Sequence, residues 1–252
     1  MIRLGEPRHY FASLPSTMEP LARLAEGGAP EGTIVVAGHQ TAGRGRAGRT
    51  FETGPGSALT LSLLLRPQVM AADLAPLPLI FGVAVAEGIE AIAGPQCHGR
   101  IGLKWPNDVL FQGKKLSGLL MQSRSTAHGV AFVNFGIGIN VNAPSDELPE
   151  GATSLFEITE ERRSIDDVER AVLDRLSVRY EEWLVHGSRP GLDAWTGRAL
   201  FLSEPVRVDN TGSQVEGVFE GVTGEGALIL QTTTGRTIIV AGDLVRGPRP
   251  NR

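Results

Sequence analysis

The part of the sequence with the clearest potential for chemistry is a loop rich in glycine and arginine at residues 43–49, Gly-Arg-Gly-Arg-Ala-Gly-Arg. Three arginines this close together repel one another unless an anion lies among them, and guanidinium groups match the geometry of carboxylate and phosphate. Glycine allows the backbone to bend closely around such a ligand. The composition therefore predicts an anion-binding loop, with a solvated linker or an RNA-binding arginine-glycine tract as the alternatives.

A second segment, Lys104-Trp105-Pro106-Asn107-Asp108, places a cation, an aromatic ring, an amide and a carboxylate around a proline turn. This composition suits a nucleotide. Trp105 can offer an apolar wall, while Asn107 and Asp108 can bond polar groups or hold a magnesium ion, directly or through water. The alternative is an ordinary hairpin turn, because proline, asparagine and aspartate are common turn residues.

Two further segments combine glycine with strand-like patterns. Lys115 stands at the mouth of an expected strand, and Gly118 interrupts an apolar run at a point where a ligand or another backbone can approach closely. A solvated lysine at a sheet edge is the alternative for Lys115. Gly136 and Gly138 lie in a stretch that ends at Asn140; it lacks the full G-x-G-x-x-G pattern and leads into no helix, which disfavours a Rossmann dinucleotide site.

Hydrophobic periodicity predicts the elements that must position these residues. Ser16 and Glu19 have the spacing of a capping box, so a short helix is expected to start there and to stop at Gly27. Alternating leucines predict a strand at 59–65, and a longer helix is expected at 74–92. Further strands are expected at residues 33–37, 101–103, 109–111, 116–122 and 129–141. Those after residue 100 are expected to form an antiparallel sheet.

The pattern changes to helix at Ser164 and later to short β runs. Apolar residues at three- and four-residue spacing predict a helix from Ser164 to about Trp183, and a second helix is expected near 192–199. The β runs, which are separated by glycine turns, lie at residues 206–208, 215–219, 227–230 and 237–240. They fit a small barrel. We therefore expect one domain at residues 1–199 and a second at 200–252.

Composition limits the class of protein. With 252 residues, 41% of them hydrophobic, the chain can bury a substantial core. Its formal net charge of -4 disfavours general attraction to nucleic acid. The start of the chain has no signal-peptide pattern, and we expect no apolar run of membrane-spanning length, so a cytoplasmic protein is expected. Cys97, the single cysteine, excludes an internal disulfide, and the histidines show no metal-ligand spacing.

Taken together, the motifs resemble the signature set of biotin protein ligases, the enzymes that attach biotin to carboxylase carrier domains. The matching segments, in family order, are Ser16-Thr17 and residues 40–49, 104–108, 115–118 and 136–140. The resemblance covers nearly the whole chain, from about Ser13 to Val245. It implies an α/β (α+β) fold in which a mixed sheet with flanking helices, similar to class II aminoacyl-tRNA synthetases, precedes an SH3-like barrel.

Carried over residue by residue, the resemblance implies the parts of a site. The implied biotin-binding residues are Ser16, Thr17, Met18, Gln40, Gly43, Arg44, Gly45, Arg46, Lys115 and Gly118. The implied nucleotide and magnesium side comprises Lys104, Trp105, Asn107, Asp108 and Asn140, with Asp108 as the candidate magnesium ligand. Lys115 is implied as the main catalytic residue, with Arg46 in the loop that closes over the intermediate. Met18 departs from family members that have asparagine there, so any hydrogen bond from that side chain is lost.

The resemblance also implies substrates and partners. These are biotin, ATP with Mg²⁺, and the carrier protein of a biotin-dependent carboxylase, with no DNA or membrane partner and a monomer or weak homodimer. Some family members carry an N-terminal helix-turn-helix domain, but fifteen residues precede Ser16 here, so a monofunctional ligase is expected.

Two alternative functions stay open from the sequence. The first is a lipoate or octanoate ligase or transferase on the related fold, against which residues 43–49 together with 104–108 favour biotin. The second is a nonenzymatic nucleic-acid-binding module. The net charge of -4 and the lack of aromatic residues within the arginine loop disfavour it.

Overall fold

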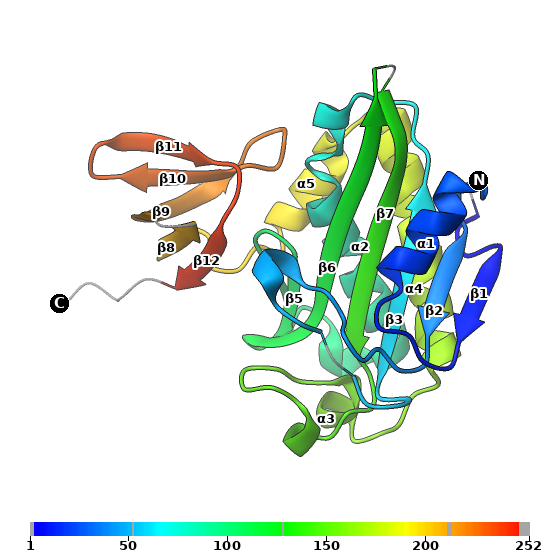
Figure 1. Ribbon diagram of the computed structural model, residues 1–252. Coiled ribbons are helices and arrows are strands. Elements are labelled where there is room, and N and C mark those ends of the chain that lie inside the picture. Colours follow the sequence, from blue (N-terminus) through cyan, green and yellow to red (C-terminus); the bar gives the residue numbers. More distant parts are fainter. Residues whose placement is uncertain (1–2, 52, 128, 211–212, 247–252) are drawn as a thin grey trace.

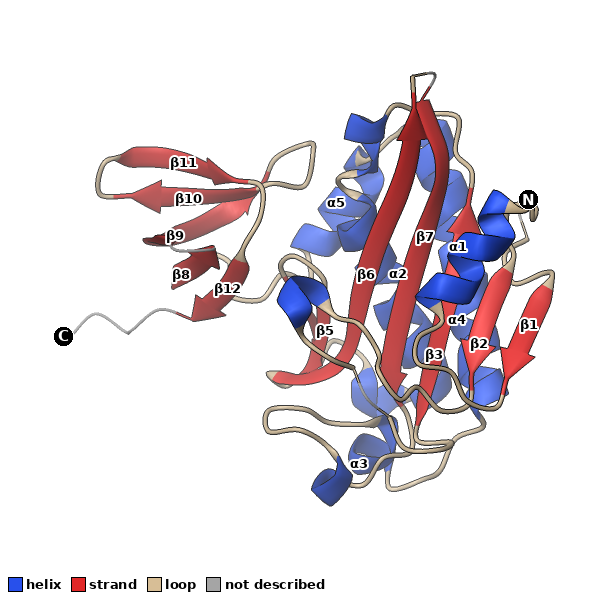
Figure 2. Cartoon of the chain, viewed as in Figure 1, coloured by secondary structure: helices blue, strands red, loops and turns tan. Residues whose placement is uncertain are grey.

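The computed structural model describes residues 3–246 except 52, 128, 211 and 212. Within these residues, seven strands form one sheet in the order β1-β2-β3-β7-β6-β5-β4 (Figures 1 and 2). The strands are β1 (Arg8–Phe11), β2 (Ile34–Ala37), β3 (Ala58–Leu65), β4 (Ile101–Lys104), β5 (Asp108–Phe111), β6 (Lys114–Thr126) and β7 (Gly129–Asn140). β1 and β2 are parallel and the other neighbours are antiparallel, so the sheet is mixed. The antiparallel arrangement expected after residue 100 is confirmed.

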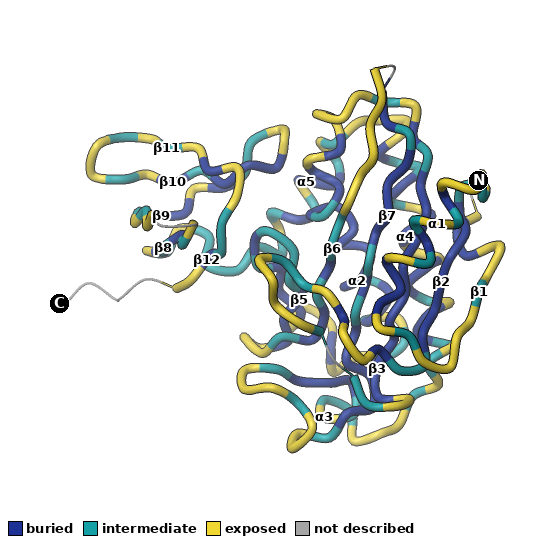
Figure 3. Tube along the Cα trace, viewed as in Figure 1, coloured by how far each residue is buried: buried dark blue, intermediate teal, exposed yellow. Residues whose placement is uncertain are grey.

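Strand β3 lies between β2 and β7 in this sheet and is buried along its whole length, as the dark tube in Figure 3 shows. Four of its leucines, Leu59, Leu61, Leu63 and Leu65, belong to the main hydrophobic core, which also includes residues of the helices behind the sheet, whereas Leu64 belongs to a smaller cluster. Its polar residues are satisfied on the other face: Thr60 Oγ1 donates to the carbonyl oxygen of Ala37 at 2.9 Å, and Ser62 Oγ lies 2.7 Å from Thr17 Oγ1. The face that carries these hydroxyl groups therefore combines a small apolar cluster with buried polar atoms.

Helices lie on both faces of the sheet (Figure 1). The helices are α1 (Met18–Glu26), α2 (Leu77–Ala93), α3 (Leu155–Thr159), α4 (Ile165–His186) and α5 (Arg189–Thr196). α1 covers part of the front face, whereas α2, α4 and α5 lie behind. The helix expected at 74–92 begins three residues later than predicted, at Leu77. A short 3-10 turn at Ala71–Leu74 precedes α2, and Pro76 and Pro78 begin a new helix because proline is tolerated in a first turn but not inside a helix.

The stretch Ala71–Ala93 is long and apolar enough to cross a membrane, which corrects the expectation that the chain has no such run. In this fold the stretch contains a core helix, and 67% of its most apolar window is buried. α2 packs closely on α4 at Gly88, where an added Cβ would lie 2.8 Å from the Cα of Val172. Packing on both the sheet and α4 accounts for apolar residues around most of the helix.

Helix α1 begins at Met18, and the expected capping box is not formed. Thr17 is the N-cap residue, but its hydroxyl bonds to Ser62 instead of capping the helix. Ser16 Oγ accepts a hydrogen bond from the Met18 amide at 3.3 Å, and the Glu19 carboxylate accepts one from Arg44 at 3.2 Å. Polar side chains at the start of α1 are therefore engaged with the pocket region. The expected stop at Gly27 is confirmed.

Five strands of the described C-terminal residues form a second, antiparallel sheet in the order β11-β10-β9-β8-β12. They are β8 (Pro205–Asn210), β9 (Ser213–Val222), β10 (Leu228–Thr232), β11 (Gly235–Ile239) and β12 (Asp243–Arg246). The sequence predicted all of them except β12. The small sheet packs on the rest of the chain: the rings of Trp195 and Phe219 are 6.4 Å apart, and Trp105 Nε1 donates to the carbonyl oxygen of Gly226 at 3.0 Å.

Candidate active site

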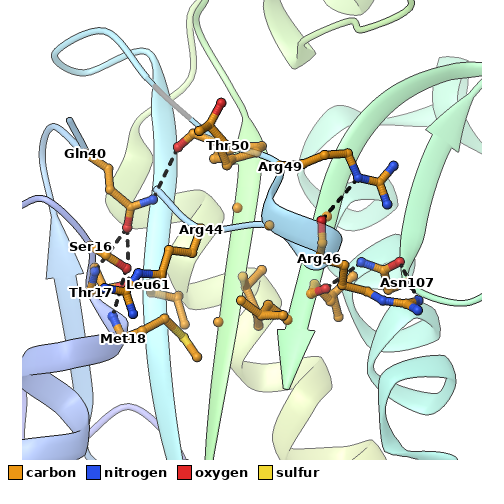
Figure 4. A pocket seen from close by; sticks show the side chains of 18 of the residues that line it. Ser16, Thr17, Met18, Gln40, Arg44, Arg46, Arg49, Thr50, Leu61 and Asn107 are labelled. Atoms are coloured by element: carbon orange, nitrogen blue, oxygen red, sulfur yellow. Dashed lines mark hydrogen bonds between the residues drawn. The ribbon is translucent and has the colours of Figure 1, made fainter. Parts of the chain in front are cut away.

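A pocket opens on the face of the large sheet that carries α1, above β7 and β6 and beneath the arginine loop (Figure 4). It is lined by most of the residues that the sequence predicted for ligand binding. These are Ser16, Thr17, Met18, Gln40, Arg44, Gly45, Arg46, Asn107, Lys115 and Gly118. Segments that lie far apart in the sequence therefore meet at one site.

The floor of the pocket is the backbone of β7 at Gly136 and Gly138. An added Cβ on Gly136 would lie 2.7 Å from Met18 Sδ, and one on Gly138 would lie 2.6 Å from the ring of Phe51. Larger residues at these positions would have to displace both side chains. The two glycines thus allow Met18 and Phe51 to lie directly on the sheet as walls of the pocket.

A buried polar network closes the end of the pocket next to α1. Gln40 Oε1 accepts a hydrogen bond from the Thr17 amide at 3.1 Å and lies 3.4 Å from Thr17 Oγ1. Gln40 Nε2 donates to the carbonyl oxygen of Phe51 at 3.3 Å, which fixes the orientation of the amide. Ser62 extends the network through Thr17. Buried polar atoms require partners, so this end suits a neutral ligand group with hydrogen-bonding capacity.

The arginine loop crosses the pocket as a tight turn. Gly43 does not line the pocket, but it must be glycine because an added Cβ would lie 2.0 Å from the carbonyl oxygen of Phe51. Ala47 and Gly48 have left-handed φ angles of 51° and 75°, which form the turn in the 3-10 segment Arg46–Gly48. Glycine adopts this conformation at low cost. The loop backbone is thus shaped by small residues while its arginines project to partners.

Arg46 is the half-buried cation of this loop. Its guanidinium donates to Asn107 Oδ1 and to the carbonyl oxygen of Gly242, both at 3.4 Å. Burial lowers the pKa of Arg46; Asp243 counteracts this effect and Arg49 adds to it. Arginine stays protonated at neutral pH even so. Arg46 is therefore a partly dehydrated charge with long hydrogen bonds, for which an anionic ligand is a better partner.

Lys115 lies at the opposite end of the pocket from the polar network. Its Nζ is 2.7 Å from Asp108 Oδ1, and the Asp108 side chain is 13% exposed. Gly118 leaves room for the Lys115 side chain to reach Asp108, because an added Cβ on Gly118 would lie 3.1 Å from Lys115 Nζ. The Lys115 amide donates to the carbonyl oxygen of Gly151 at 2.8 Å. The amine is thus positioned by a carboxylate and by a backbone that is hydrogen-bonded to the segment around Ala152.

A second cavity adjoins the first, and Thr50, Phe51 and Lys115 line both. Asn140 lines the second cavity and donates from Nδ2 to the carbonyl oxygen of Thr153 at 3.0 Å, which leaves its side-chain oxygen directed elsewhere. Two adjoining cavities with one amine on their border can hold two ligands whose reacting ends meet at that amine.

Three residues of the predicted nucleotide side, Lys104, Trp105 and Asp108, do not line either cavity. Trp105 is 2% exposed, and its ring packs in the core while its Nε1 bonds to Gly226 of the small sheet. Lys104 ends β4 opposite Asp108 in the β4–β5 pairing. Asp108 reaches the site through its ion pair with Lys115. The structure therefore places Trp105 at the junction of the two sheets, where it lines a third cavity that shares Arg46 and Asn107 with the first.

Several residues of the pocket were not predicted. Phe51 and Thr50 follow the arginine loop directly, and Leu61 was assigned to a strand without a site role. An aromatic residue immediately after an anion-binding loop is a signal that could have identified Phe51. No local pattern distinguishes Leu61 from the other leucines of β3, because its role depends on which strands lie beside it.

The chain matches two protein-family models. The first, described as the Biotin/lipoate A/B protein ligase family, matches residues 10–142, and the second, the Biotin protein ligase C terminal domain, matches residues 201–247. The Bifunctional ligase/repressor BirA of Bacillus spizizenii is 36% identical over 248 residues, which cover 97% of this chain and 75% of the relative. The Biotin--[acetyl-CoA-carboxylase] ligase of Paracoccus denitrificans is 35% identical over 219 residues, which cover 84% of this chain and 90% of the relative.

Solved structures agree with these matches. The biotin protein ligase from Aquifex aeolicus in complex with biotin and ATP superposes with a TM-score of 0.80 at 32% identity, covering 95% of this chain and 98% of that chain. The first family match and the fold place the chain among the biotin and lipoate protein ligases. The chain belongs to the biotin protein ligase family and is a ligase that activates biotin and transfers it to protein.

Proposed function

We propose that biotin lies in the pocket above β7 with its ring in the buried polar network and its carboxylate at Lys115, and that ATP lies in the adjoining cavity with its α-phosphate at the same amine. The observation that carries this proposal is the position of Lys115 on the border of both cavities. Biotin's cyclic urea is neutral and has N–H donors and a carbonyl acceptor, which suits Thr17 and Gln40. Its carboxylate and the α-phosphate are anions, which suits Lys115 on the border and the loop arginines that line the first cavity.

In the first step, a carboxylate oxygen of biotin attacks the α-phosphorus of ATP. A new O–P bond forms, the bond to the bridging oxygen of the leaving group breaks, and biotinyl-adenylate and pyrophosphate result. The charged groups of Lys115 and Arg46 offset the negative charge that develops around the phosphorus. Asp108 holds the amine in place, 2.7 Å from its Oδ1.

In the second step, the amine of a carrier lysine attacks the acyl carbon of the adenylate. A C–N bond forms, the bond between the acyl carbon and the phosphate oxygen breaks, AMP leaves, and the amine loses a proton to solvent. The arginine loop retains the reactive adenylate until that lysine arrives. The name of the Paracoccus denitrificans relative supports a carrier domain of a biotin-dependent carboxylase as the acceptor.

The described residues offer magnesium no site made of several protein ligands. Among the described residues, no group of three or more His, Cys, Asp or Glu side chains is arranged to hold a metal ion, and Asp108, the predicted candidate, pairs with Lys115. Magnesium prefers several water and phosphate ligands. We propose that Mg²⁺ arrives bound to the phosphates of ATP.

We also propose a boundary near residue 200 between a catalytic domain and a small β domain. The two separate sheets and the second family match, which begins at residue 201, support it. Our further proposals are a cytoplasmic location and a monomer or weak homodimer. The reaction written above needs no DNA or membrane.

A lipoate or octanoate ligase is the second candidate, because the first family description includes lipoate. The match of residues 201–247 to a biotin ligase domain and the named relatives favour biotin. Exchange of labelled pyrophosphate into ATP tests the proposal. We expect exchange that depends on biotin and is not supported by lipoate or octanoate. Folded protein that shows no biotin-dependent exchange would exclude the first step.

A further inference from the structure

Met18, the first residue of α1, is held in place on both sides of its backbone. Its amide donates to Ser16 Oγ at 3.3 Å, and its carbonyl oxygen accepts from Asn134 Nδ2 at 2.7 Å. The residue is 5% exposed. These two hydrogen bonds fix the backbone of Met18, and therefore the point on α1 from which its side chain enters the pocket.

The Met18 side chain forms the closed end of the pocket. Its sulfur lies over β7, 2.7 Å from the position of a Cβ on Gly136, and accepts a hydrogen bond from Ser62 Oγ at 3.3 Å. Gly136 pairs with Leu120 of β6. Lys115 also lies on β6, but five residues before Leu120, towards the start of that strand. Met18 and Lys115 are therefore at opposite ends of the pocket, with Met18 beside Thr17 in Figure 4.

The sulfur also determines how the neighbouring hydroxyl groups are oriented. A hydroxyl carries one hydrogen. If Ser62 donates its hydrogen to Met18 Sδ, Thr17 must supply the hydrogen for the 2.7 Å contact between Thr17 Oγ1 and Ser62 Oγ. Gln40 Oε1 then receives the Thr17 amide but not the Thr17 hydroxyl, which lies 3.4 Å away. Lone pairs on Gln40 Oε1 and Thr17 Oγ1 stay free to accept N–H groups of a ligand.

We propose that Met18 determines which acids this ligase accepts. Its thioether sets the width of the closed end, and it keeps Thr17 and Gln40 available as acceptors, so the pocket selects a ring of biotin's size that presents N–H donors. This inference rests on the proposed function, because it requires the ring to lie at the α1 end and the carboxylate at Lys115.

The size effect is tested by calorimetric titration without ATP, using biotin and biotin sulfone, whose ring sulfur carries two additional oxygens. In the parent protein we expect a clear preference for biotin. Met18→Ala removes the wall, and we expect this preference to fall by about tenfold or more, as is usual when a pocket gains space for a small group. Met70→Ala is the matched control, because Met70 is 62% exposed and does not line the pocket.

The hydrogen-bond effect is tested by Met18→Leu, which keeps nearly the same volume but removes the sulfur acceptor. Ser62 can then donate to Thr17, and Thr17 to Gln40, which consumes acceptors that the ligand needs. We expect biotin to bind about tenfold more weakly, in the range of a lost hydrogen bond, with the preference over the sulfone unchanged. Thermal unfolding of each variant shows that it is folded.

A second-site variant tests the contact itself. Gly136→Ala should weaken biotin binding, because its Cβ would lie 2.7 Å from Met18 Sδ, and the double variant Gly136→Ala with Met18→Ala should recover part of the loss. If Met18→Ala weakens both acids by the same factor and Gly136→Ala is equally harmful with either residue at position 18, the proposal is overturned. If the parent protein binds no biotin, the proposed function fails instead.

Discussion

Arg49 of the arginine loop and Asp243 of β12 form an ion pair in which Nη2 and Oδ1 are 2.7 Å apart, so the small sheet holds the loop that covers the pocket. Both side chains are more than a third exposed, at 51% and 36%, so the pair adds little to folding stability. We predict that Asp243→Asn leaves the melting temperature nearly unchanged and speeds release of biotinyl-adenylate by up to about fivefold, the limit for an exposed pair worth about 1 kcal/mol. A chase of preformed labelled adenylate measures this rate.

The matched control is Glu220→Gln, because Glu220 forms its ion pair with Arg236 within the small sheet, where Oε2 and Nε are 3.2 Å apart. Its release rate should equal that of the parent. A cycle that combines Asp243→Asn with Arg49→Gln should show that the two effects are not additive. Additive effects would show that the pair does not position the loop.

We predict that the Arg46→Gly variant releases biotinyl-adenylate faster than the variants that lack the ion pair between Arg49 and Asp243. The change removes a guanidinium that contacts Asn107 and Gly242, and it adds a further flexible residue to a loop that already has three glycines. Ordering each loop residue costs about 1–2 kcal/mol of backbone entropy, so the open loop gains population. Escaped adenylate reacts with any amine, so labelling of serum albumin is the measurement. Unchanged labelling would contradict a retaining role for the loop.

Lys115→Ala is predicted to lower single-turnover adenylation by about 100-fold or more, which is typical for the loss of one electrostatic group at the reacting atoms. Lys114→Ala is the control, because Lys114 is exposed on the neighbouring position of β6 and borders neither cavity. Binding of biotin and the melting temperature are measured alongside, since the change leaves Asp108 without its cation. Near-normal adenylation by Lys115→Ala would show that Lys115 is a solvated lysine at the sheet edge without a catalytic role.

Much of the sheet and most of the pocket could be predicted from the sequence, because strand periodicity and the five motifs are local signals. β1 could not be predicted in the same way, since it has four mostly exposed residues and is a strand through its pairing with β2. Trp105 shows the limit for the site. Its local segment suits a nucleotide, but its indole is buried against Gly226, a partner 121 residues away. Contacts between residues this far apart depend on how the elements pack, and a local sequence pattern does not predict that packing.

A buried tyrosine on the far side of the sheet allows one prediction about stability. Tyr180 is fully buried, and its hydroxyl donates to Glu31 Oε1 at 2.6 Å. Burial raises the pKa of Tyr180, and the Glu31 carboxylate raises it further, so the folded state favours the protonated hydroxyl. Tyr180→Phe keeps the ring contact with Trp183, whose centroid is 5.9 Å away, and removes the hydrogen bond alone.

We predict that Tyr180→Phe lowers the free energy of unfolding at pH 7 by about 1.5–3 kcal/mol, the range for a hydrogen bond to a charged group. Because the folded pKa of Tyr180 is raised, its contribution is complete below the pKa of the unfolded chain, about 10, and declines as the pH rises above that value. Urea unfolding of parent and variant should therefore differ by a constant amount from pH 6 to 9 and by less above about pH 10. Tyr10→Phe, at a site that is 58% exposed, should have almost no effect. A difference between parent and Tyr180→Phe that grows above pH 10 would show that the hydroxyl is not held protonated against Glu31.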